Sequence, residues 1–280
     1  MQVAHFAHKA RRTRQCHALG LPIEPLSRPA SRISALFHWK GQALSEVASS
    51  VGGDATADPR SPAGFTEAVG EAVAAPFVRR VLTFSELRDP LGLQAQLEQA
   101  ATMLGLARCL DEVVIPVTRQ LRGPAATGLY DATHGVMATE AIRTWLNHRG
   151  LFAPSPRPIG PILLACGPRD RQVVGVECLG LLLRFQRWPC RVLGARVPTF
   201  TLTVAAQAAD AAGVVVVSNE NRARQHAVAS IRAVDAIGIP VFYAGAAFES
   251  DDARRDVPGR YLGPGVAGAS DMLTTSLALV

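Results

Sequence analysis

The sequence predicts an α/β protein in which a doubly wound parallel sheet follows an all-α four-helix bundle. Beyond residue 158, short apolar runs alternate with amphipathic stretches, as strands alternate with crossover helices. Over residues 63–148, apolar residues recur at helical spacing. The four consecutive valines at 214–217 are typical of a central parallel strand that is buried on both faces.

Four helices are expected in the bundle, residues 63–150. Asp89-Pro90 and Gly123-Pro124 separate them, because proline cannot donate to the helical ladder. For the same reason Pro116 is expected to kink the third helix. The expected helices span residues 65–82, 91–104, 107–121 and 128–148. A stiff proline-rich linker, residues 151–158, leads into the second domain.

The second domain, residues 159–280, is expected to be a flavodoxin-like (Rossmann-type) sheet in the strand order 2-1-3-4-5. The expected strands span 162–165, 191–193, 214–218, 241–244 and 261–262. The expected helices span 172–187, 202–212, 222–237 and 266–279. In such sheets ligands bind at the carboxyl ends of the strands, near strands 1 and 3, so the site is expected there.

Positive charge is concentrated at the N-terminus. Residues 1–40 contain seven lysines and arginines and one acidic residue, Glu24, which accounts for the whole net charge of +6. The rest of the chain is neutral, and this argues against an extended nucleic-acid face. We expect residues 1–62 to be a basic, disordered tail, with direct DNA contact through it as the less favoured alternative.

The composition also indicates a compartment. The five cysteines are scattered and form no Cys-x-x-Cys pair, which is typical of buried thiols in a reducing environment. No run of 18 apolar residues is present, so no membrane span is expected. No apolar segment follows the basic N-terminal residues, as it would in a secretory signal. The sequence therefore predicts a cytoplasmic protein.

Small residues follow three of the predicted strands. They are Cys166-Gly167, Gly245-Ala246 and the segment Gly263-Pro264-Gly265. Such residues let a large flat ligand approach the backbone closely. A bare phosphate site would instead need a Gly-x-Gly-x-x-Gly loop or a lysine, and these strand ends have neither.

The corner after the first strand carries the most specific motif. Asp170, Gln172 and Gly175 have the spacing Asp-x-Gln-x-x-Gly. This resembles the Asp-x-His-x-x-Gly corner of cobalamin-binding domains. Over residues 76–279 the chain resembles the cobalamin modules of corrinoid methyltransferases. It is more similar to CarH-type light sensors and to the PpaA/AerR family of photosystem antirepressors. The resemblance implies cobalamin as the cofactor.

Other positions carry the resemblance less completely. Ser218 matches the serine of a Ser-x-Leu motif after strand 3, and Ala244-Gly245 keeps one glycine of a Gly-Gly pair. Thr133-His134 matches a Glu-His pair of the light-sensing bundle, with the acid lost. The bundle also lacks the tryptophan that CarH-type sensors carry. Gln172 replaces the histidine that ligates cobalt, and an amide is a poor ligand for that metal.

Several of these residues have two interpretations. Gln172 either hydrogen-bonds the ligand or faces solvent on a helix for which Asp170 is the N-cap. His134 is either a replacement metal ligand or a structural histidine. Met137 and Trp145 either line a chromophore pocket or belong to the bundle core. The residues expected to contact the cofactor are Cys166, Gly167, Asp170, Gln172, Gly175, Ser218, Tyr243, Gly245, Ala246, His134 and Met137.

The resemblance implies a regulatory protein rather than an enzyme. Cobalamin, held between bundle and sheet, would respond to light or redox state. The response would change contacts with a partner, by similarity a transcriptional repressor of photosynthesis genes. One alternative keeps the sensor fold with biliverdin or haem as the tetrapyrrole. The other is the corrinoid protein of a methyltransferase system, whose Asp-His relay Gln172 would break.

Overall fold

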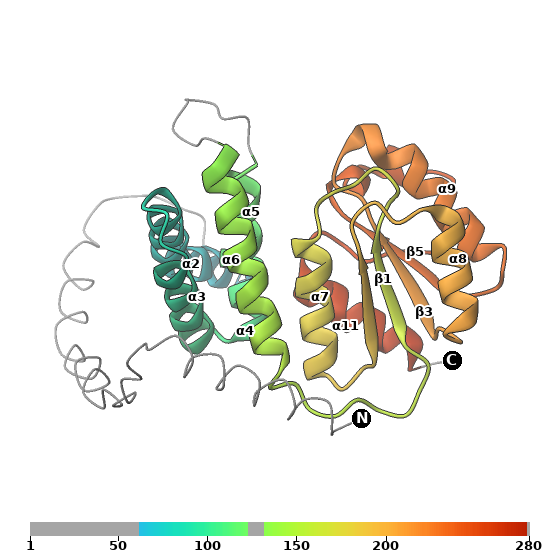
Figure 1. The fold of residues 1–280 in the computed structure, drawn as a ribbon, viewed down its shortest axis with the longest axis horizontal. Helices are drawn as coiled ribbons and strands as arrows, with labels where there is room; N and C mark the ends of the chain where they lie inside the picture. Colours follow the sequence, from blue (N-terminus) through green and yellow to red (C-terminus); the bar gives the residue numbers. More distant parts are fainter. Residues whose placement is uncertain (1–61, 123–131, 279–280) are drawn as a thin grey trace, which may run out of the picture. The chain divides into compact units, whose positions relative to one another are not determined.

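Five parallel strands form one sheet in the order β2-β1-β3-β4-β5 (Figure 1). The computed structural model describes residues 62–122 and 132–278, so most of the predicted tail and the start of the predicted fourth helix lie outside the described residues. The strands are β1 (Ile162–Cys166), β2 (Cys190–Gly194), β3 (Gly213–Val217), β4 (Val241–Ala244) and β5 (Arg260–Tyr261). The predicted α/β class and strand order are confirmed.

Helices cover both faces of the sheet. α7 (Val174–Phe185) and α11 (Val266–Leu277) pack on one face, around Leu164 and Val215. α8 (Thr199–Ala208) and α9 (Arg224–Asp235) pack on the other, around Val214 and Val216 (Figure 1). The β3 residues are buried on both faces, as the run of valines predicts. Short turns, η4 (Asn221–Ala223), η5 (Ala246–Phe248) and α10 (Asp251–Arg254), follow β3 and β4.

The bundle consists of α2 (Pro62–Glu86), α3 (Pro90–Leu104), a third helical stretch and α6 (Ala132–Gly150). Asp89 caps α3, because its Oδ1 accepts hydrogen bonds from the backbone N–H groups of Leu91 and Gly92. The third stretch runs through α4 (Leu106–Cys109), a π-helical turn η3 (Leu110–Val114) and α5 (Ile115–Gln120). The π turn lies directly before Pro116, so the ladder is irregular where the proline lacks a donor.

α7 belongs to two hydrophobic cores. Val176, Leu179 and Leu183 face the sheet. The opposite side of α7 packs into the bundle core with residues such as Ile142 of α6. A helix that is apolar all round is buried all round, and this explains the composition of the segment VGVECLGLLLRF. Within the unit 61–280, the bundle is therefore fused to the sheet layer through a shared core.

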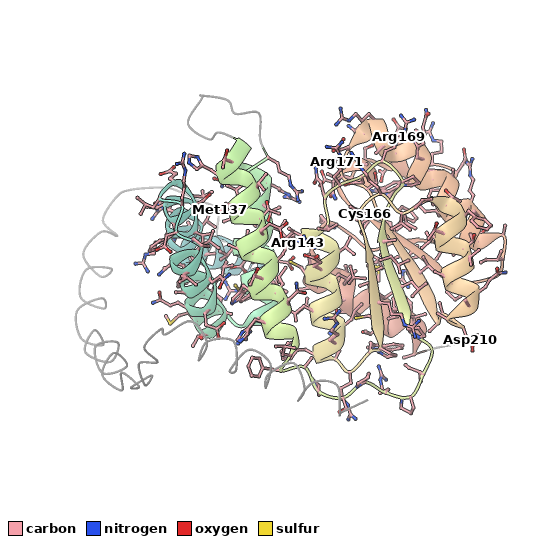
Figure 2. The ribbon with its side chains drawn as sticks, viewed as in Figure 1. Met137, Arg143, Cys166, Arg169, Arg171 and Asp210 are labelled. Atoms are coloured by element: carbon pink, nitrogen blue, oxygen red, sulfur yellow. The ribbon has the colours of Figure 1, made fainter. Side chains whose placement is uncertain are left out.

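Polar contacts add to this shared core. Arg143 of α6 lies between α6 and α7 and pairs with Glu177 at 2.9 Å (Figure 2). The predicted linker is held at the end of α7, where the Arg157 guanidinium lies 4.1 Å from the centre of the Trp188 ring. Among the described residues, no helix is long and apolar enough to cross a membrane.

Asp111 of the bundle caps a helix of the sheet domain. Its two carboxylate oxygens accept hydrogen bonds from the backbone N–H groups of Val266 (2.5 Å) and Ala267 (3.0 Å), in the first turn of α11. The N-cap residue of α11, Gly265, has no side chain that can do this. A carboxylate at this position satisfies orphan donors and interacts favourably with the helix dipole.

We therefore expect Asp111→Ala to lower the free energy of unfolding by about 1–2 kcal/mol, as loss of an N-cap does. The measurement is urea unfolding followed by circular dichroism. Glu112→Gln is the control, because the described ion pair of Glu112 is with exposed Arg108 on its own helical stretch. Equal stability of the two variants would contradict the capping role of Asp111.

Candidate functional site

A pocket opens at the carboxyl ends of β3, β4 and β5, on the face of the sheet that α7 and α11 cover. Its volume is about 90 Å³. The bundle contributes one wall from α5 and the residues after it, so the pocket lies where bundle and sheet meet. The lining residues are Ile115, Thr118, Arg119, Arg122, Gln172, Gly175, Leu179, Val217, Asn219, Ala244, Gly245, Ala246, Glu249, Gly263, Pro264, Gly265, Val266 and Ala269.

Small residues line the wall formed by the strand ends, as the sequence predicts. Gly245 has φ 104° and ψ 162°, a backbone conformation that is essentially restricted to glycine. A Cβ atom there would lie 2.2 Å from the Ser218 carbonyl oxygen. Gly245 therefore lets the chain after β4 pass close to the end of β3. At Gly175 the nearest atom to a Cβ would be Ile115 Cδ1, at 3.9 Å, so its lack of a side chain widens the pocket.

Asp170 joins the corner after β1 to the end of β3. It is fully buried, and its Oδ1 accepts a hydrogen bond from the Gln172 backbone N–H at 2.8 Å. Its Oδ2 accepts a second hydrogen bond from the Asn219 backbone N–H. The hypothesis that Asp170 caps the following helix is wrong, because α7 begins four residues later with Val173 as its N-cap. Instead, Asp170 fixes the backbone of two pocket-lining residues, Gln172 and Asn219, through these hydrogen bonds.

Gln172 lies in the pocket wall, and its side chain takes part in a hydrogen bond. The side-chain oxygen accepts a hydrogen bond from the guanidinium of Arg122, which follows α5. The contact joins the bundle to the corner after β1. The interpretation of Gln172 as a purely solvent-facing helix residue is wrong, since it precedes α7 and lines the pocket.

The end of β3 carries an unsatisfied hydroxyl. Ser218 is fully buried, and its Oγ has no hydrogen-bond partner among the described residues. Its sequence neighbours Val217 and Asn219 both line the pocket. A buried hydroxyl without a partner is costly unless a ligand or water satisfies it. The Ser218 hydroxyl is therefore an unused hydrogen-bonding group directly behind the pocket wall that these two neighbours form.

Cys166 and Gly167 lie beneath the pocket and do not line it. The Cys166 thiol is buried and donates a hydrogen bond to the Gln172 carbonyl oxygen at 3.3 Å. Burial raises the pKa of this thiol well above its ordinary value, so it remains protonated. A Cβ atom at Gly167 would lie 2.9 Å from the Ala227 Cβ of α9, so this glycine is required for helix packing.

Four further candidate residues are not brought to the pocket. Tyr243 packs in the core on the α8–α9 face, with its ring 4.9 Å from that of Phe248, and burial raises its pKa. His134 of α6 accepts a hydrogen bond at Nε2 from Arg88 Nε, at 2.9 Å. Met137 is half-buried on α6. Trp145 belongs to the bundle core, where its Nε1 donates to Glu98.

The structure therefore brings together Gln172, Gly175, Gly245 and Ala246 of the predicted set, with Asp170 and Ser218 directly behind them. Sequence reasoning missed the bundle residues of the pocket, above all Arg122. No signal pointed to it, because it lies 50 residues from Gln172 in the chain. In the described part of the chain, no group of three or more His, Cys, Asp or Glu side chains is arranged to hold a metal ion.

The chain was compared with known proteins. No protein-family model matches it, and no curated protein matches it in sequence. Its fold is similar to that of a monomethylamine corrinoid protein from Methanosarcina barkeri. The TM-score is 0.58 at 9% sequence identity, over 74% of this chain and 99% of that chain. This likeness shows a shared fold.

Two other solved structures are similar at a lower level. One is the methanol:cobalamin methyltransferase complex MtaBC from Methanosarcina barkeri, with a TM-score of 0.39 at 14% identity, over 73% of this chain and 81% of that chain. The other is a cobalamin-binding protein from Desulfitobacterium hafniense DCB-2. It has the same TM-score, identity and share of this chain, and 91% of that chain is covered. These two scores are too low to add to the fold assignment.

Proposed function

We propose that this protein binds cobalamin at the carboxyl edge of its sheet. The observation that carries the proposal is the pocket at the strand ends, with its glycine-lined wall and the unsatisfied Ser218 hydroxyl at the end of β3. Open α/β sheets bind ligands at this edge. The similarity of the fold to that of a corrinoid protein supports cobalamin as the ligand.

The residues present fit part of such a ligand. A pocket of about 90 Å³ is smaller than the roughly 300–1,000 Å³ that encloses a whole small molecule. It can receive an arm of cobalamin, while the macrocycle stays outside. Gly175 keeps the space open, and the unsatisfied Ser218 hydroxyl lies directly behind the wall of strand ends. When bound, cobalamin would supply a cobalt ion that exchanges its axial ligands.

In this proposal the corner after β1 provides no axial ligand. Gln172 has an amide in place of an imidazole, and its oxygen already accepts a hydrogen bond from Arg122. Among the described residues no histidine lines the pocket. This corner would therefore hold cobalamin without ligating its metal.

Two roles fit a protein that binds cobalamin in this way. The corrinoid protein of a methyltransferase system agrees with the fold likeness, and a methyltransferase would then be its partner. A light- or redox-responsive regulator, acting without catalysis on a transcriptional repressor, is the second candidate. It is favoured by the identity of residue 172, because a glutamine there leaves no Asp-His relay at this corner and Asp170 bonds to its backbone N–H instead.

An ultraviolet–visible spectrum tests the proposal directly. The protein is supplied with cobalamin, biliverdin or haem and measured before and after illumination. Retained corrin bands support cobalamin, and a light-dependent change of those bands supports the regulator. Turnover with a methyl donor and an acceptor supports the methyltransferase role. Retention of only biliverdin or haem would overturn cobalamin as the ligand.

Gln172→His is expected to change the spectrum of the cobalamin complex toward that of a histidine-ligated form, because imidazole binds cobalt far better than an amide does. Gln225→His is the matched control, since Gln225 is exposed on α9, over the other face of the sheet. Identical spectra for both variants would place residue 172 away from the metal.

A further inference from the structure

Arg122 lies across the pocket from the strand ends. It is the second residue after α5, and its guanidinium donates a hydrogen bond to the Gln172 side-chain oxygen. Arg119, one turn earlier, also lines the pocket, so the bundle presents two guanidinium groups to this space. Arg119 lies 3.9 Å from Glu249, with both side chains more than half exposed, and such a pair contributes little.

Two carboxylates, Asp170 and Glu220, act on the charge of Arg122 through space. Within the described ranges, no carboxylate lies within ion-pair distance of it. Asp170, the nearby buried acid, already uses both oxygens to accept backbone hydrogen bonds. Glu220 pairs with Arg222 at 2.6 Å. Arg122 is accessible to solvent at the pocket mouth, while protein on its other sides desolvates the guanidinium and lowers its pKa.

A guanidinium has five N–H donors, and among the described residues Arg122 donates to a neutral amide oxygen. A phosphate or carboxylate oxygen accepts more strongly than an amide, because the hydrogen bond is then assisted by charge. The facing wall is formed by the small residues Ala244, Gly245 and Ala246, which leave room for such a group. Arg122 would therefore bind a phosphate group at this site, the role that a glycine-rich loop has in other phosphate-binding proteins.

We propose that Arg122 binds the anionic group of the ligand, which for cobalamin is the phosphodiester of its nucleotide arm. This inference rests on the proposed function. The phosphodiester accepts hydrogen bonds from the guanidinium N–H groups that Gln172 does not use. Arg122 is thus a specificity residue: it selects corrinoids that carry the nucleotide arm over those that lack it.

The experiment compares cobalamin with cobinamide, which lacks the nucleotide arm and its phosphate. Both are titrated in excess cyanide, so that cyanide occupies both axial positions of each cobalt and only the arm differs. The proteins are the wild type, Arg122→Gln, Arg122→Lys and the control Arg108→Gln. Arg108 is an exposed arginine of the same helical stretch, paired with Glu112 and outside the pocket. Circular dichroism verifies that each variant is folded.

We expect Arg122→Gln to weaken cobalamin binding about 10- to 100-fold, the effect of losing a hydrogen bond to a charged group. Its cobinamide affinity should stay within about twofold, Arg122→Lys should recover part of the loss, and Arg108→Gln should change neither. Equal weakening of both corrinoids, or an unchanged cobalamin affinity, would overturn the inference and leave the proposed function standing. A wild-type protein that binds neither corrinoid would overturn both.

Discussion

Gly245→Ala is expected to lower the free energy of unfolding by at least about 3 kcal/mol. Two effects contribute to this loss of stability: backbone strain and a steric clash. The backbone conformation at residue 245, with φ 104° and ψ 162°, strains any residue that has a Cβ atom. The added Cβ would also meet the Ser218 carbonyl oxygen at 2.2 Å, far inside van der Waals contact. The chain after β4 must then move away from β3, and the pocket wall moves with it.

Urea unfolding measures the loss of stability, and cobalamin titration of the folded fraction measures the effect on the site. Gly268→Ala is the matched control. A Cβ atom there meets nothing within 4 Å and lies in the first turn of α11, so alanine should be accommodated without loss of stability. Similar stabilities for the two variants would show that Gly245 is not required by its conformation.

Asp170→Asn is expected to lower the free energy of unfolding by about 2–3 kcal/mol. The side chain keeps its shape, but it loses its charge and one of two acceptor oxygens. One of the backbone N–H groups of Gln172 and Asn219 then faces an NH₂ group in a fully buried position. Because these two residues line the pocket, affinity for cobalamin should fall together with stability.

Thermal and urea unfolding of Asp170→Asn test this prediction. Asp210→Asn is the control, because Asp210 is exposed, lies far from the corner after β1, and has a positive φ that asparagine tolerates well (Figure 2). If Asp170→Asn were as stable as Asp210→Asn, the two backbone hydrogen bonds would contribute nothing measurable to the fold.

Local sequence patterns were sufficient to predict the helices and strands of the α/β domain and the order of its strands. The valines of β3 predict a strand that is buried on both faces, and strands separated by amphipathic segments predict crossover helices. The right-handed crossover then restricts the order of the strands. The ends of helices were predicted less well: α7 begins at Val174, two residues later than expected, because Asp170 and Gln172 form the corner and not the first turn.

The sequence by itself determined the sheet, the corner motif Asp-x-Gln-x-x-Gly and the small residues at the strand ends, because each depends on residues that are close in the chain. Tertiary structure alone decided which of them form one pocket. Folding placed Tyr243 on the opposite face and brought Arg122 to Gln172 across 50 residues. It also fused the bundle to α7 and set Asp111 on the first turn of α11. These contacts depend on how two layers pack, which no periodicity within either layer encodes.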